Sequence, residues 1–215
     1  MQQSVILAGF GGQGLLFAGQ VLAQAALGEG REVSWMPSYG PEMRGGTASC
    51  TVIVSDRLIG SPIVDAADVV IALNPPSLAR FEPIVAPGGL LIVNASLIDQ
   101  EPGRTDIELA GIPCSALARA AGDDRLISVV ALGAILARRQ IVDPESLRAA
   151  LIEVVGQKRP ALIAANLAAL ASGELAAAAT ALHTARVEGV PATSFAKVVA
   201  HAASQSPHSV HGGAR

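Results

Sequence analysis

The stretch ILAGFGGQGLLFAGQ, residues 6–20, predicts a short buried strand, a glycine loop and the start of a helix. Gly9, Gly11 and Gly14 have the spacing G-x-G-x-x-G, and Gly12 adds a fourth glycine. Glycines let the backbone approach a phosphate closely, at the positive end of the helix that follows. The same spacing also serves as a tight turn that binds nothing. The loop alone therefore leaves both interpretations open.

Strand and helix signals alternate around this loop. Continuous apolar or β-branched runs predict strands at 5–8, 31–38, 47–56, 68–73 and 88–94. Residues 15–27 have apolar side chains at helical spacing. This alternation predicts an α/β fold, a doubly wound and mainly parallel sheet with helices on both faces.

A helical C-terminal region follows the sheet. Helices are predicted at 125–139, at 143–155 with Asp143 as the N-cap, and at 159–183, where Gly173 is a possible break. We predict a single domain over residues 1–200, with a Rossmann-like sheet to about 115 and a mainly helical part over about 120–200. Residues 201–215 show no periodic apolar face and are expected to form a disordered tail.

The composition excludes several classes of protein. The net charge is −3 without a basic block, which argues against a nucleic-acid surface. The apolar run at the N-terminus has no positive region before it, and the apolar window 127–137 is too short to span a bilayer. We expect a cytoplasmic protein. Cys50 and Cys114 are too few for a cluster or a zinc site and are expected to be buried, reduced thiols.

The end of the second predicted strand argues against binding of a dinucleotide. An NAD or FAD site needs an acidic residue at the end of that strand, which here reads Trp35-Met36-Pro37-Ser38. No Walker-type phosphate loop is present either. The connection PSYGPEMRGG, residues 37–46, is rich in proline and glycine and carries Arg44, whose guanidinium could bind a phosphate or carboxylate. The alternative is an ordinary surface arginine.

These loops together make the chain resemble the gamma subunit, or gamma domain, of the 2-oxoacid:ferredoxin oxidoreductases, with the 2-oxoglutarate type most similar. The family pattern G-x-G-G-Q-G is matched by Gly9, Gly11, Gly12, Gln13 and Gly14. The pattern S-Y-G-P-E-x-R-G-G is matched by Ser38, Tyr39, Gly40, Pro41, Glu42, Met43, Arg44, Gly45 and Gly46. The likeness continues to about residue 175. It departs at Ser128-Val129-Val130, where the family often has Asn-Met-Val.

The resemblance implies one subunit of an enzyme that converts a 2-oxoacid and coenzyme A into acyl-CoA and CO2, with two electrons passed to ferredoxin. Thiamine diphosphate, magnesium and iron–sulfur clusters are then expected on alpha, beta or ferredoxin-like subunits. This chain has no Gly-Asp-Gly thiamine signature, Gly122-Asp123-Asp124 being the nearest string. We therefore expect no catalytic residue, no metal and no activity from this chain alone.

The resemblance also directs the site predictions. The glycine loop, Gln13 and Arg44 are predicted to contact coenzyme A or a partner subunit, and residues 38–46 are a predicted subunit interface. Asn74 and Asn94 join this site because each follows a buried strand, where ligands bind in open α/β sheets; the alternative is that both only cap turns. Two other functions stay open, a stand-alone mononucleotide- or coenzyme A-binding regulatory domain and a free flavin or NAD oxidoreductase.

Overall fold

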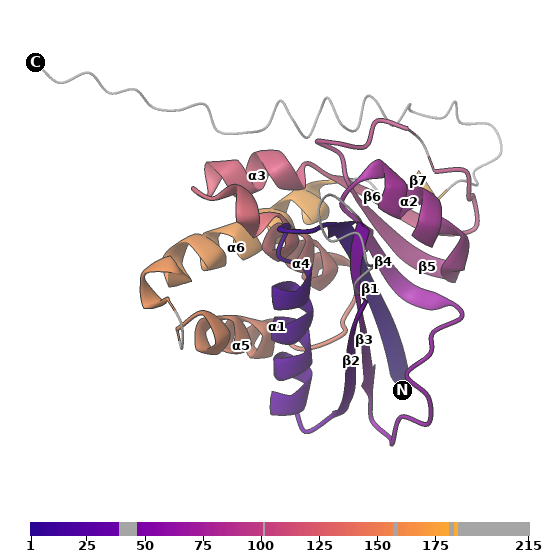
Figure 1. Ribbon diagram of the computed structural model, residues 1–215, viewed down its shortest axis with the longest axis horizontal. Coiled ribbons are helices and arrows are strands. Elements are labelled where there is room, and N and C mark those ends of the chain that lie inside the picture. Colours follow the sequence, from indigo (N-terminus) through magenta and orange to yellow (C-terminus); the bar gives the residue numbers. More distant parts are fainter. Residues whose placement is uncertain (39–46, 101, 157–158, 181–182, 185–215) are drawn as a thin grey trace, which may run out of the picture.

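The computed structural model in Figure 1 describes residues 1–38, 47–100, 102–156, 159–180 and 183–184. Its single seven-stranded sheet has the order β2-β3-β1-β4-β5-β6-β7. The strands are β1 Gln2–Phe10, β2 Glu32–Ser38, β3 Thr47–Ser55, β4 Ala67–Ala72, β5 Val85–Asn94, β6 Glu108–Ile112 and β7 His183–Thr184.

The sheet is mainly parallel, as the sequence predicts. β1, β2, β4, β5 and β6 run in one direction, and β3 and β7 run against them. Val5 and Leu7 enter the larger core on one face of β1, whereas Ile6 and Ala8 enter a smaller core on the other face. Because both faces of this strand are covered, its sequence is continuously apolar.

Helices cover both faces of the sheet, which confirms the doubly wound prediction. The helices are α1 Leu15–Gly28, α2 Pro75–Phe81, α3 Cys114–Ala120, α4 Ile127–Arg138, α5 Pro144–Gly156 and α6 Ile163–Ala179. Figure 1 shows α1, α4, α5 and α6 on one side of the sheet and α2 on the other. The sequence patterns did not predict β6, α2 or α3, because β6 contains only five residues and each of the two helices seven.

Gly173 does not break the last helix, so the predicted C-terminal segment forms one long helix rather than two shorter ones. α6 runs without interruption from Ile163 to Ala179. A Cβ atom at Gly173 would overlap the backbone of Val130 in α4, and one at Gly133 would overlap the backbone of Leu170 in α6. The two glycines therefore let α4 and α6 pack backbone to backbone.

One helical stretch of the described chain, Pro160–Ala179, is long and apolar enough to cross a membrane by length and composition alone. Its buried side includes Ala169, Leu170 and Ala177, all in the larger core. The apolar window 127–137 lies in α4, whose residues from Ile127 to Ile135 are buried. The proposed extent of the domain stays a prediction, and the predicted tail, 201–215, lies outside the described residues.

Candidate functional site

The glycine loop connects the end of β1 to the start of α1 at the carboxyl edge of the sheet. Gly12 has a φ of +91° and Gly14 a φ of +77°, a region that glycine enters without strain. Gly14 is the N-cap of α1, and as a glycine it has no side chain that could cap the helix. Gly11 and Gly12 are exposed. The loop thus brings backbone N–H groups and the positive end of a 14-residue helix to the surface.

Gln13 folds back onto its own loop. Its Oε1 accepts a hydrogen bond from the backbone N–H of Phe10 at 2.6 Å. This amide lies where a Cβ atom on Gly9 would be, so the glycine at position 9 makes room for the Gln13 side chain. The oxygen of Gln13 is therefore engaged in shaping the loop, and its Nε2 is the end left for the predicted contact with a ligand or partner.

Gly14 lies directly against the start of α4. A Cβ atom at this position would be 2.6 Å from Ser128 Oγ and 3.2 Å from the carbonyl oxygen of Arg125. The turn before α4 is held by Asp123, whose Oδ1 accepts from the backbone N–H of Arg125 at 2.9 Å. Hydrogen bonds from the Arg125 side chain and backbone lower the pKa of the Asp123 carboxyl group to about 2. The carboxylate of the Gly122-Asp123-Asp124 string thus stabilises a helix start beside the glycine loop.

The Ser128 hydroxyl is fully buried and has no hydrogen-bond partner among the residues that the structure describes. A buried, unsatisfied polar group costs about 1–3 kcal/mol. We therefore expect Ser128→Ala to raise the free energy of unfolding by about 1 kcal/mol, measured by urea denaturation. Ser172→Ala is the matched control, because Ser172 Oγ donates to the carbonyl oxygen of Ala169 at 2.8 Å and its loss should lower stability. A clear loss of stability in Ser128→Ala would contradict this interpretation.

Asn74 lies just after β4, Asn94 is the last residue of β5, and both are at the same edge as the glycine loop. The residue before Asn74, Leu73, donates its backbone N–H to the carbonyl oxygen of Ala8 at 2.8 Å, which joins the end of β4 to the end of β1. The structure therefore brings these three strand ends together. In Figure 1 this edge is the upper end of the sheet, with α3 on one side of it and α2 on the other.

Both asparagines are fully buried and hold turns. Asn74 Oδ1 accepts from the backbone N–H of Ser77 at 2.8 Å and caps α2, while Asn74 Nδ2 has no partner within the described part of the chain. Asn94 Nδ2 donates to Ser115 Oγ at 2.8 Å, and Asn94 Oδ1 accepts from the backbone N–H groups of Ser96 and Ser115 at 3.3 and 3.2 Å. Direct contact of either side chain with a ligand stays a prediction. Ser96 and Ser115 were not predicted as site residues, although they follow shortly after β5 and β6.

The predicted interface segment is only partly visible. Ser38 ends β2 as an exposed residue, paired with Ser49 of β3. Residues 39–46, which include Arg44, lie outside the described residues. Thr47 then begins β3 opposite Phe10 of β1. The two ends of this segment are thus anchored at the edge that carries the glycine loop.

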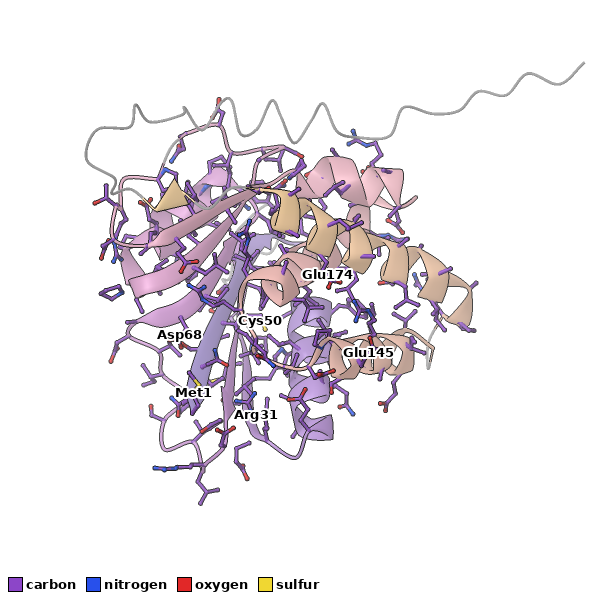
Figure 2. All side chains as sticks on the ribbon, turned by 180° about the vertical axis from the view of Figure 1, so that it is seen from behind. Met1, Arg31, Cys50, Asp68, Glu145 and Glu174 are labelled. Atoms are coloured by element: carbon purple, nitrogen blue, oxygen red, sulfur yellow. The ribbon has the colours of Figure 1, made fainter. Side chains whose placement is uncertain are left out.

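Both cysteines are buried and free, as expected. Burial raises the pKa of the Cys50 thiol to about 11, although a hydrogen bond from Trp35 lowers this pKa to a smaller extent. Burial also raises the pKa of the Cys114 thiol to about 12. Figure 2 shows Cys50 in the interior, between the sheet and α1. Within the described ranges, no group of three or more His, Cys, Asp or Glu side chains could hold a metal ion.

Comparisons with known proteins agree with this arrangement. The family model described as pyruvate ferredoxin/flavodoxin oxidoreductase matches residues 4–176. The ketoisovalerate oxidoreductase subunit VorA of Methanothermobacter thermautotrophicus is 45% identical over 148 residues, which is 68% of this chain and 31% of that protein. The chain therefore spans about a third of that relative's length.

Two solved structures have the same fold. The 2-oxoglutarate:ferredoxin oxidoreductase from Magnetococcus marinus, with 2-oxoglutarate, coenzyme A and succinyl-CoA bound, has a TM-score of 0.74 and 27% identity over 82% of this chain and 31% of that one. The keto/oxoacid ferredoxin oxidoreductase gamma subunit from Geobacter sulfurreducens has a TM-score of 0.71 and 28% identity over 81% of this chain and 98% of that one. Since the family match spans most of its length, the chain belongs to the pyruvate ferredoxin/flavodoxin oxidoreductase family.

Proposed function

We propose that this chain is the gamma subunit of a 2-oxoacid:ferredoxin oxidoreductase complex and that its glycine loop contacts coenzyme A. The observation that carries the proposal is the match to nearly the whole gamma subunit of the Geobacter sulfurreducens enzyme. The complex would convert a 2-oxoacid and coenzyme A into acyl-CoA and CO2 and pass two electrons to ferredoxin. The chain would act as a cytoplasmic assembly subunit with no catalytic residue of its own.

The partners in this proposal are alpha and beta subunits, and a ferredoxin-like subunit where the complex has one. Thiamine diphosphate, magnesium and iron–sulfur clusters would be bound by these partners, where decarboxylation and electron transfer take place. The contribution of this chain would be to complete the complex and to position coenzyme A. Residues 38–46 are the segment that we propose for contact with the partner subunits.

The shape of the carboxyl edge supports a contact with the phosphates of coenzyme A. Gly11 and Gly12 are exposed, and the uncapped α1 N-terminus adds a favourable electrostatic potential for an anion. The segment that contains Arg44 is anchored at the same edge by Ser38 and Thr47. An arginine there would add a charge-assisted hydrogen bond to a phosphate.

The SYGPE form of the loop resembles the types that use 2-oxoglutarate or branched-chain oxoacids, and of these we propose 2-oxoglutarate as the substrate. The Magnetococcus marinus structure, which contains 2-oxoglutarate, adds support. A branched-chain oxoacid, 2-oxoisovalerate, is the second candidate, because VorA is named as a ketoisovalerate oxidoreductase subunit and is 45% identical.

Reconstitution tests the proposal. The chain should be purified alone and together with co-expressed alpha and beta subunits, and each preparation assayed with both oxoacids, coenzyme A and oxidised ferredoxin. We expect the isolated chain to be colourless and inactive, and the complex to lose coenzyme A-dependent turnover when this chain is omitted. Oxoacid oxidation by the isolated chain would overturn the proposal. Tight binding of coenzyme A without any association with the other subunits would favour a stand-alone regulatory domain.

A further inference from the structure

β2 is an edge strand that exposes large side chains on both of its faces. Among the described strands it pairs with β3 alone and stands at one end of the strand order. Trp35 is 40% exposed and Met36 is 43% exposed. Because successive side chains of a strand point to opposite faces, these two residues lie on either side of the sheet edge. Figure 1 shows β2 beside α1 and β3.

Trp35 is held in place despite its exposure. Its Nε1 lies 2.8 Å from where a Cβ atom on Gly19 of α1 would be, and it hydrogen-bonds the Cys50 thiol. The Nε1 and Cδ1 atoms of the five-membered ring are thus a part of the indole that packs against α1. A side chain fixed in this way loses little conformational entropy when a partner covers it.

The strip from Val33 to Ser38, which we call the β2 edge, carries no charged residue. Exposed edge strands usually carry charges that prevent pairing with other chains. Tryptophan and methionine are enriched at protein–protein interfaces, and buried aromatic anchors often dominate their binding energy. An uncharged strip with a pre-positioned tryptophan has the composition of an interface.

The comparisons indicate the kind of partner that such a strip would meet. The domain makes up 31% of the VorA chain, so in that protein it is covalently joined to a much longer polypeptide. It makes up nearly all of the Geobacter sulfurreducens gamma subunit, which is a separate chain. Where this domain is a separate chain, it needs a surface that binds the rest of the enzyme without a covalent link.

We propose that the β2 edge, with Trp35 and Met36 as anchors, is the surface that docks the partner chain equivalent to the additional part of VorA. This inference rests on the proposed function. The edge ends at Ser38, the first residue of the segment proposed for contact with the partner subunits. The partner would present an apolar, uncharged face on either side of the sheet edge.

The single tryptophan of the chain makes a direct test possible. The chain labelled with 5-fluorotryptophan would be mixed with the unlabelled alpha and beta subunits, and the 19F resonance of Trp35 recorded in H2O and in D2O. We expect the solvent isotope shift of the free chain to decrease at least threefold on complex formation. If the complex forms and this shift is unchanged, the inference fails while the proposed function stands. If no complex forms, the proposed function fails.

A variant pair provides a second measurement. Met36→Lys places a charge on the β2 edge, and Leu175→Lys places one on α6, where Leu175 is 72% exposed. We expect Met36→Lys to weaken association with the partner subunits at least tenfold in a titration, and Leu175→Lys to change it less than twofold. Equal effects of the two variants would overturn the inference. So would a dimer of the isolated chain that Met36→Lys dissociates, because a second copy would then occupy the edge.

Discussion

Replacement of Gly173 by alanine is expected to lower the free energy of unfolding by about 3 kcal/mol, because the added methyl group would collide with backbone atoms of Val130. Those atoms belong to α4 and cannot move away as a flexible side chain could. α4 and α6 must then separate, and Gly133, which packs against Leu170 from the other helix, would lose its close contact as well. For a chain of this size the midpoint of thermal unfolding should fall by about 6–12 °C.

Whether Gly173→Ala lowers or raises stability distinguishes a packing collision from a gain in helix propensity. In an exposed helix, glycine to alanine gains up to about 1 kcal/mol from helix propensity alone, so only a packing collision gives a large loss. Gly28, the last residue of α1, provides the control because a Cβ atom there would meet nothing within 4 Å. Gly28→Ala should leave the unfolding midpoint unchanged or slightly raised. An increase in stability for Gly173→Ala, measured by calorimetry, would show that the two helices do not pack as described.

Replacement of Arg44 by alanine in the assembled complex is expected to raise the KM for coenzyme A about tenfold or more. A charge-assisted hydrogen bond contributes about 1.5–3 kcal/mol, and about 1.4 kcal/mol corresponds to a factor of ten. Decarboxylation of the oxoacid without coenzyme A should continue, since that step needs only thiamine diphosphate on a partner subunit. The measurement is steady-state kinetics with coenzyme A varied at saturating oxoacid.

An interface role for Arg44 predicts a different result, in which the variant dissociates and every partial reaction falls together. Subunit retention should therefore be measured by native mass spectrometry on the same preparation. Arg57→Ala is the matched control, because Arg57 is exposed and follows β3 at the opposite end of the sheet from the glycine loop. An unchanged KM and an intact complex for Arg44→Ala would remove Arg44 from both roles.

Much of the fold could be predicted because its signals are local. A strand covered on both faces must be apolar at every position, and Val5–Ala8 shows this in four successive residues. The start of α5 is equally local, since Asp143 Oδ1 accepts from the backbone N–H of Glu145 two residues later. β6 was missed because its five residues include Glu108 and Gly111, and its pairing with β5 depends on a distant segment.

The candidate site, like the fold, could be predicted only in part from the sequence. The positions of the glycine loop, Asn74 and Asn94 at one edge of a sheet follow from strand ends, which sequence patterns identify. What each side chain contacts does not follow, because the neighbours are remote in the chain. Asn94 binds Ser115, which is 21 residues away. In addition, nothing local to Gly14 indicates that Ser128 lies against it.

By itself, the sequence determined the α/β class, the glycine loop after the first strand and the motifs of the family, because these depend on residues close together in the chain. The tertiary structure alone decided why particular glycines are needed. Gly14 lies under the start of α4, Gly9 makes room for Gln13, and Gly173 lets α6 meet Val130. It also decided that Trp35 stands at an open sheet edge. The physical reason is that close packing is set by the docking of elements far apart in sequence, which no local pattern encodes.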